Sequence, residues 1–387
     1  MKRIKELSKE FKSLLESEEN QRRKEVQQKL HRLEAVYPAA FNSWTYTTTF
    51  PIVIIDWCNR LGRSVDIEAV GRATGPLSKD FAAEMIEFQL LAKIESFKTR
   101  PDDVPLSPAL NTNLGLCWMY TKGGLGERYI INEASGAFVP VPILKEESDL
   151  DKLVAPHFRF DRALHEQRVA VYKELVDGEF PIADDGLPRG VNATFQTANN
   201  LRGVLEILLD TKDRPAFVHR LMDFIAEAIL ACDRQARKQS GGPRFGTFGC
   251  DEVSCDMFAP AVYEEFIFPY ECKAAAAYDS IYYHSCGNLT PLYKKIVDIP
   301  NIHCVQVSPW SDLPTAIRDA GGKAILQKWL DPTVNLDKLS RDEMRALVKQ
   351  VTDLGTDYPL EMIVPTGTPG GRLYREIFYE ETGALSS

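Results

Sequence analysis

"SIYYHSCGNLT", residues 280–290, is a short apolar run that stops abruptly at His284, Cys286 and Gly287. A short run of apolar and aromatic residues bounded by a glycine is typical of a buried strand. The next residues, LTPLYKKIVDI, carry apolar positions at helical spacing. A buried strand therefore leads through a tight turn into a helix, and this unit decides the fold class.

The same unit recurs along most of the chain. From residue 101 onward, short apolar or β-branched runs alternate with long amphipathic helices, which is the pattern of a parallel sheet. The candidate strands cover residues 104–110, 180–184, 190–195, 246–250, 280–284, 302–308, 324–328 and 361–365. About eight such units over roughly 290 residues favour an α/β fold of the closed (β/α)8 TIM barrel type over an open doubly wound sheet. Neither GxGxxG nor GxxxxGK[ST] follows a candidate strand, which weakens the dinucleotide-binding and P-loop alternatives.

The domain organisation follows from the change of pattern near residue 100. We expect residues 1–100 to form an N-terminal helical extension, because they are rich in strong helix formers, and residues 101–387 to form the barrel. The segment 112–145 fits an insertion after the first barrel strand, with antiparallel strands that cover one mouth. The extension could seal the barrel bottom or mediate a homodimer, and the sequence leaves both possibilities open.

Composition excludes several classes of function. The 387 residues are 44% hydrophobic, which is enough for a substantial core, and the formal net charge of -9 supplies no basic face for nucleic acid. No apolar run reaches the roughly 18 residues that span a bilayer, and the charged N-terminus lacks the apolar core of a signal peptide. The eight cysteines are scattered, unlike those of a disulfide scaffold. We expect a cytoplasmic protein that acts on small molecules or proteins.

Polar side chains end nearly every candidate strand. Chemistry in a TIM barrel takes place at the carboxyl ends of the strands, so these residues are candidates for a site. The loops that begin at those points would also explain many of them without any function. The strand ends carry Asn111, Asn113, Asp184, Asp185, Asp251, Glu252, His284, Cys286, Ser308, Trp310, Asp312, Gln327, Lys328, Asp331, Thr366 and Thr368.

His284 and Cys286 form the strongest pair among these residues. Residues i and i+2 at the end of a strand lie on the same side, so an imidazole nitrogen and a thiolate could reach one ion. Zn²⁺ accepts both kinds of ligand, and its catalytic sites use three protein ligands with one exchangeable position. The alternative is a core histidine bonded to a backbone carbonyl, beside an inert buried cysteine.

A third ligand must come from elsewhere in the chain. Asp251 and Glu252 end the preceding strand and lie at the correct level, although a helix cap or a solvated pair would explain them equally well. Cys250 and Cys255 flank them and stay possible. Cys304 begins its own strand, and at roughly 3.3 Å per residue it should lie over 10 Å too deep.

Three segments of the chain resemble the uroporphyrinogen decarboxylase superfamily, including its methyltransferase branch. The resemblance extends over roughly residues 100–370 and implies a (β/α)8 barrel with its site at the barrel mouth. It is carried by FGCDEVSCDMFAPAVYEEFIFPYECKAAAAYDSIYYHSCGNLTPLY (248–293), VQVSPWSDLPTAIRDAGGKAILQKWLDP (305–332) and TFQTANNLRGVLEILLDTKDRPAFVHRLMDFIAEAI (194–229).

The resemblance separates two chemistries. The decarboxylases carry a motif of the type MRQAGRYLPEY that grips substrate carboxylates, whereas the first strand here reads VPLSPALNTNLG and offers no such arginine. The zinc methyltransferase branch binds metal through H-x-C, matched by His284 and Cys286, and through a later cysteine. That cysteine is missing, because the last strand reads EMIVPTGTPGGRL. Relatives that demethylate aryl methyl ethers use carboxylates with a histidine, which makes Glu252 or Asp251 the substitute.

The resemblance thus implies a corrinoid-dependent methyltransferase with Zn²⁺ as a Lewis acid and cobalamin presented by a partner corrinoid protein, since no D-x-H-x-x-G motif occurs in the chain. Its substrate would be a small methylated compound, with O-demethylation as one case. Two alternatives stay open: a metal-free decarboxylase of a tetrapyrrole or other carboxylated substrate, and a non-catalytic corrinoid or tetrapyrrole binder. We assign His284, Cys286 and Glu252 to the metal, Asp251 and Glu252 to catalysis, and expect the substrate to contact Asn113, Asp184, Tyr283, Trp310, Lys328 and Thr366.

Overall fold

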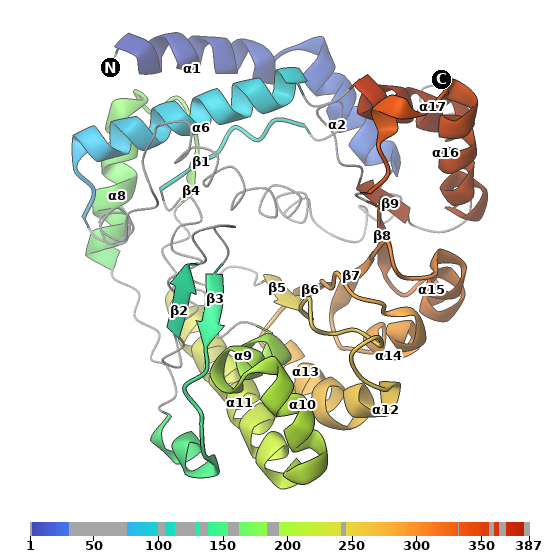
Figure 1. The fold of residues 1–387 in the computed structure, drawn as a ribbon. Coiled ribbons are helices and arrows are strands. Elements are labelled where there is room, and N and C mark those ends of the chain that lie inside the picture. The colour runs from blue at the N-terminus through green and yellow to red at the C-terminus, as the bar shows by residue number, and fades with distance from the viewer. Residues whose placement is uncertain are drawn as a thin grey trace.

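The structure is a computed structural model of the chain. It describes residues 2–30, 76–99, 105–112, 128–131, 138–153, 162–183, 193–240, 245–331, 333–355, 360–363 and 369–382. In the ribbon view the helices lie around the outside and the parallel strands lie inside them (Figure 1).

The C-terminal half contains a five-stranded parallel sheet in sequence order. Its strands are β5 (Phe245–Phe248), β6 (Ser280–Tyr283), β7 (Ile302–Val307), β8 (Ile325–Trp329) and β9 (Leu360–Ile363). The connecting helices are α12 (Pro260–Val262), a π-helical turn (Tyr263–Ile267), α13 (Phe268–Ala275), α14 (Tyr293–Ile296), α15 (Leu313–Ala320) and α16 (Arg341–Gly355). Neighbouring parallel strands joined through helices are the predicted βα units.

The two faces of this sheet bury different side chains. Tyr283, Val305 and Leu326 belong to the main hydrophobic core, which also contains side chains of the surrounding helices. Tyr282, Cys304 and Ile325 form a separate buried cluster. Successive side chains of a strand point to opposite faces, so the second cluster marks the inner face of the sheet.

A second pair of parallel strands comes from the first half of the chain. Strand β1 (Leu110–Asn111) pairs with β4 (Ile182–Ala183), so two predicted strands are present but are shorter than expected. The predicted strand 190–195 is wrong at Thr194 and Phe195, where helix α9 begins, and residues 190–192 lie outside the described residues. A short buried apolar run does not distinguish strand from helix, and α9 is buried on almost every side.

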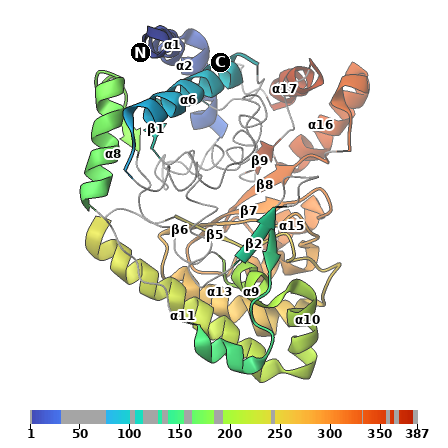
Figure 2. The same ribbon diagram turned by 60° about the vertical axis from the view of Figure 1, so that its left-hand side comes forward.

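The N-terminal helices are α1 (Lys2–Leu15), α2 (Glu18–Leu30) and α6 (Lys79–Thr99). Ile4, Leu7 and Phe11 lie at helical spacing on α1 and share a buried cluster with α6. The same cluster includes Leu110 of β1 and Tyr172 of α8 (Arg162–Leu175). Helix α6 contacts the first strand pair directly through Gln89 and Asn111, and it lies between α1 and β1 in Figures 1 and 2. None of the described helices combines the length and apolarity needed to cross a membrane.

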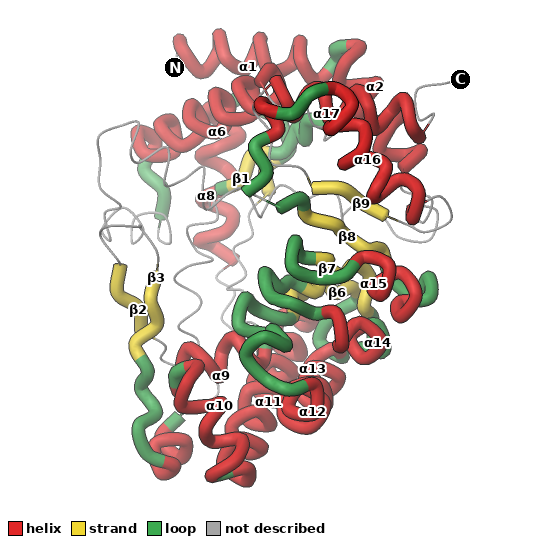
Figure 3. Tube along the Cα trace, turned by 45° about the vertical axis from the view of Figure 1, so that its right-hand side comes forward, coloured by secondary structure: helices red, strands yellow, loops and turns green. Residues whose placement is uncertain are grey.

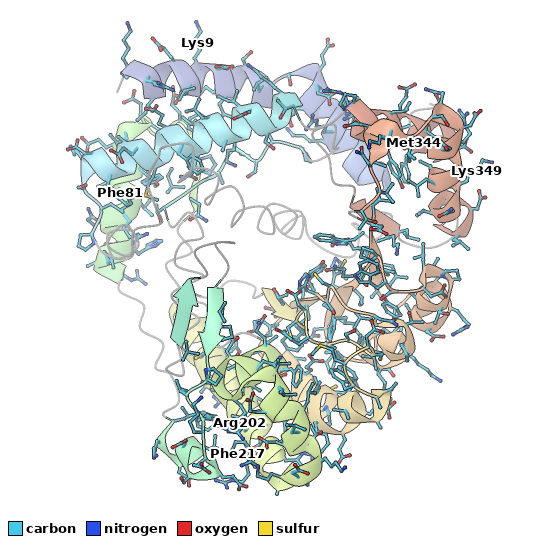
Figure 4. All side chains as sticks on the ribbon, viewed as in Figure 1. Lys9, Phe81, Arg202, Phe217, Met344 and Lys349 are labelled. Carbon is cyan, nitrogen blue, oxygen red and sulfur yellow. The ribbon has the colours of Figure 1, made fainter. Side chains whose placement is uncertain are left out.

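The predicted insertion contains the expected antiparallel strands, β2 (Arg128–Ile131) and β3 (Phe138–Val141). A 3-10 helix (Glu147–Lys152) follows β3. Beyond α8 and β4 come three consecutive helices, α9 (Thr194–Arg202), α10 (Val204–Asp213) and α11 (Pro215–Ser240). The buried Arg202 joins them, because its guanidinium lies 2.8 Å from Asp210 and over the ring of Phe217 (Figure 4).

The last helix, α17 (Pro369–Thr382), packs on α16 through ion pairs of Arg345.

Candidate metal centre

Three potential metal ligands meet at the carboxyl ends of β5 and β6. Asp251, His284 and Cys286 each offer a ligand atom, and these atoms lie within 4.8 Å of one another. Nε2 of His284 lies 3.0 Å from Oδ1 of Asp251 and 3.9 Å from Sγ of Cys286. Among the described residues this is the only group of three or more histidine, cysteine or acidic side chains that approach so closely. The loops that carry it, green in Figure 3, lead from the sheet to the outer helices.

A glycine turn brings the two strand ends together. Gly249 follows β5 with a φ of +72°, and a Cβ there would lie 2.2 Å from the carbonyl oxygen of His284. The backbone N–H of His284 donates to the carbonyl of Phe248 at 2.9 Å, which extends the β5–β6 pairing to the edge of the site. Only glycine meets both conditions, because it tolerates the positive φ and has no Cβ.

Side-chain hydroxyls hold the β5 loop against the β6 loop. Ser285 Oγ donates to the carbonyl of Val253 at 2.7 Å, and Ser254 Oγ accepts from the backbone N–H of Asn288 at 3.0 Å. Gly287 lies so close to Ser254 that a Cβ would meet its Cβ at 2.4 Å. These buried contacts fix the loop of Asp251 relative to that of Cys286, although both of these side chains are exposed.

The β7 loop is attached to the same assembly. Ser308 Oγ donates to the carbonyl of Gly287 at 2.6 Å, and Ser311 Oγ accepts from the backbone N–H of Leu289 at 2.9 Å. Nζ of Lys328 donates to the carbonyl of Ser308 at 2.9 Å. Lys328 thus anchors this loop in the structure, and burial lowers its pKa.

The electrostatics of the triad favour a cation. Burial by itself lowers the pKa of His284, but the hydrogen bonds and charges of Asp251 and Cys286 outweigh it and raise this pKa to about 10. The hydrogen bond to His284 in turn lowers the pKa of Asp251 to about 2. Without an ion, the group therefore holds a proton between His284 and Asp251. A divalent cation competes for the same place, because metal ligands must give up their protons.

Glu252 does not belong to this triad. Its Oε2 is buried and accepts no hydrogen bond from the part of the chain that the structure describes. The neighbouring Cys250 is buried, and burial together with the charge of Glu252 raises the pKa of its thiol well above the usual value. Cys250 is therefore a poor source of a thiolate ligand. Of the two carboxylates predicted to complete the site, the structure brings only Asp251 within reach.

The prediction that Tyr283 contacts the substrate needs correction. Its side chain is fully buried and belongs to the hydrophobic core, so it forms no wall of a substrate site. Its hydroxyl donates to Oε1 of Glu271 at 3.3 Å, and Tyr263 donates to Oε2 at 2.7 Å. In a parallel sheet alternate residues face the helices, which places Tyr283 outside and Tyr282 inside.

The remaining predicted substrate contacts are spread along the chain. Trp310 follows β7 and is 57% exposed, which leaves its indole free to meet another molecule. Asn113, Asp184 and Thr366 lie outside the described residues.

The sequence reasoning missed two residues beside the site. Gln306 Oε1 lies 2.6 Å from Nδ1 of His284, and Glu271 is a fully buried acid below Gly249. Two signals were available: Gln306 interrupts an apolar strand, IHCVQV, and Glu271 lies at helical spacing from the apolar Ile267 and Ala274. A polar residue on a buried face is informative.

Two comparisons place the chain among known proteins. The family Uroporphyrinogen decarboxylase (URO-D) matches residues 116–368. A solved structure, "methyltransferase from Methanosarcina mazei", superposes with a TM-score of 0.52 at 15% identity, covering 84% of this chain and 96% of that one. No curated protein matches the sequence. Both findings agree with the predicted TIM-barrel fold, of which the β1–β4 pair and the β5–β9 sheet are parallel segments. The chain belongs to the uroporphyrinogen decarboxylase family.

Proposed function

We propose that the chain is a zinc-dependent methyltransferase that moves a methyl group between a small methylated substrate and a corrinoid. The observation that carries this proposal is the convergence of Asp251, His284 and Cys286 at the ends of β5 and β6. Chemistry in TIM barrels takes place at that end of the strands. The structural likeness to a methyltransferase supports the reaction type over decarboxylation.

The donor set fits zinc. An imidazole, a thiolate and a carboxylate are all ligands of Zn²⁺, and three protein ligands leave the fourth position open, as in catalytic sites. In this proposal Asp251 replaces the cysteine that the last strand lacks, and Glu252 is not a ligand. Because a carboxylate oxygen replaces a second thiolate, the three ligands form a harder donor set. Such a set suits an ether oxygen and favours O-demethylation of an aryl methyl ether.

Each residue of the site then has a definite task. Bound here, zinc supplies Lewis acidity toward the substrate atom from which the methyl group departs. Asp251, His284 and Cys286 hold the ion, and Cys286 loses its proton on binding. The exposed Trp310 offers an apolar surface for the substrate, while Asn113, Asp184, Lys328 and Thr366 stay candidate contacts. The chain contains no D-x-H-x-x-G motif, so cobalamin belongs on a separate corrinoid protein.

A second function is favoured by one observation. The 3.0 Å contact between His284 and Asp251 also resembles an acid–base pair that works without metal. A decarboxylase of this kind would protonate its substrate through the imidazolium and would be insensitive to chelators.

The test is a methyl-transfer assay with cob(I)alamin and three donor classes: methoxylated aromatics, methylamines and methylthiols. We expect consumption of cob(I)alamin with one class, and loss of that activity in Cys286→Ser. The control is Cys272→Ser, since Cys272 lies on α13 outside the triad. Chelator-resistant release of CO2 from a carboxylated substrate, with no methyl transfer, would establish the decarboxylase instead.

A further inference from the structure

We propose that Gln306 is a positioning residue of the metal centre, whose amide oxygen keeps the proton of His284 on Nδ1 and thereby directs Nε2 to the ion. This inference rests on the proposed function. It concerns a side chain of β7 that contacts the metal ligand and not the metal.

The hydrogen bond itself identifies the donor. Oε1 of Gln306 lies 2.6 Å from Nδ1 of His284, and Gln306 is buried with only 1% exposure. Such a distance suits an N–H donor with an oxygen acceptor and is too short for a bond between two nitrogens. The amide oxygen only accepts, so Nδ1 of His284 must carry the proton.

The position of that proton decides what the other nitrogen does. With Nδ1 protonated, the neutral ring keeps a lone pair on Nε2, which is the atom nearest to Asp251 and Cys286. With the Gln306 amide reversed, its NH2 group would face Nδ1, and the neutral ring would keep its proton on Nε2, where it opposes metal binding. The orientation of this amide thus decides which nitrogen keeps its proton once an ion has displaced the proton that His284 shares with Asp251.

Polar side chains of the neighbouring strands surround this amide. Tyr282 of β6 places its hydroxyl 3.1 Å from Oε1 of Gln306 and 2.7 Å from Oε1 of Gln327, and its single proton serves one of them at a time. The indole N–H of Trp329 donates to Oε1 of Gln327 at 2.9 Å, which fixes the orientation of that second amide because an indole only donates.

The chain of contacts therefore runs across β6, β7 and β8. The ring of Tyr282 also stacks near His284, with centroids 6.3 Å apart. Gln306 and Gln327 are directly paired in the β7–β8 register. Side chains on paired strands are held more rigidly than side chains on loops, so the imidazole is oriented before an ion arrives.

The test measures zinc affinity of the full-length protein by competition with a chromophoric chelator. Removing the acceptor in Gln306→Leu should weaken zinc binding by about 10- to 100-fold, because outer partners of a ligating histidine have effects of this size. Gln306→Glu keeps an acceptor for Nδ1–H, so its affinity should equal or exceed that of the wild type. Thermal unfolding with excess chelator shows whether each variant folds.

A spectroscopic measurement on the wild-type protein tests the same inference without any substituted protein. In the zinc-loaded protein with ¹⁵N-labelled histidine, we expect Nδ1 of His284 to carry the proton and Nε2 to bind the ion. Coordination through Nδ1, or an unchanged affinity in folded Gln306→Leu, would overturn the inference while leaving the zinc site intact. A wild type that binds no zinc would overturn the proposed function and this inference together.

Discussion

The buried carboxylic acid at Glu271 should make the stability of the protein depend on pH. Its side chain is fully buried between α13 and the sheet, where it accepts from the hydroxyls of Tyr263 and Tyr283 and from the backbone N–H of Gly249. Burial is the largest influence and, despite these hydrogen bonds, raises the pKa of Glu271 from its usual 4.5 to about 7. The informative change is Glu271→Gln, which keeps the volume and an acceptor oxygen but removes the charge.

The sign and size of the effect follow from this pKa. Between pH 4.5 and 7 the unfolded chain loses the Glu271 proton while the folded chain keeps it, so the free energy of unfolding falls as the pH rises. A tenfold change in an acid constant corresponds to about 1.4 kcal/mol, so the loss should approach about 3 kcal/mol by pH 8. Glu271→Gln escapes this loss and should gain stability relative to the wild type over that range.

Urea unfolding at pH 5, 6, 7 and 8 measures this difference directly. The control is Glu264→Gln, which changes an exposed acid on the π-helical turn beside α13. The difference between Glu271→Gln and the wild type should grow with pH, and that between Glu264→Gln and the wild type should stay constant. A Glu271→Gln difference that does not vary with pH would refute the reasoning.

Three further substitutions test the construction of the fold and site. Gly249→Ala should lower both the stability of the protein and its zinc affinity, because the new Cβ would meet the carbonyl of His284. The control is Gly321→Ala: Gly321 also has a positive φ, but no atoms lie near it, so this change should cost only about 1 kcal/mol in chemical unfolding. Equal losses in the two alanine variants would contradict the close approach at Gly249. Asp210→Ala should cost about 3–5 kcal/mol, since it leaves the buried guanidinium of Arg202 without its carboxylate, and a loss below about 1 kcal/mol in the same assay would refute that.

The fold was predictable where local pattern and burial agree. The runs at β6 and β7 are buried along their whole length, and the predicted strands lie within one residue of the observed ones. The prediction failed at Thr194 and Phe195, because α9 is buried on nearly all sides and has no polar face to show a helical period. A helical period of apolar residues appears in the sequence only where one face of the helix meets the core and the other meets solvent. A fully buried helix has no such boundary and therefore shows no period.

The site was predictable only as a location. Strand-end reasoning brought His284, Cys286 and Asp251 to one place, because the ends of neighbouring parallel strands must adjoin. The choice between Asp251 and Glu252 depends on the turn at Gly249, which adjacent positions in a sequence do not reveal. Gln306 was visible only as a polar residue in an apolar strand, because its contact with His284 joins two neighbouring strands that are far apart in the sequence.

The most direct test of the whole account is the zinc content of the protein, purified without chelators and then titrated with a competing chelator. The account predicts stoichiometric zinc in the wild type, loss of zinc in His284→Ala, a weakened site in Asp251→Asn, and an unchanged site in Glu252→Gln. A folded wild type that neither retains nor binds zinc would contradict the central claim. Loss of zinc in Glu252→Gln with full retention in Asp251→Asn would contradict the assignment of Asp251 as the third ligand.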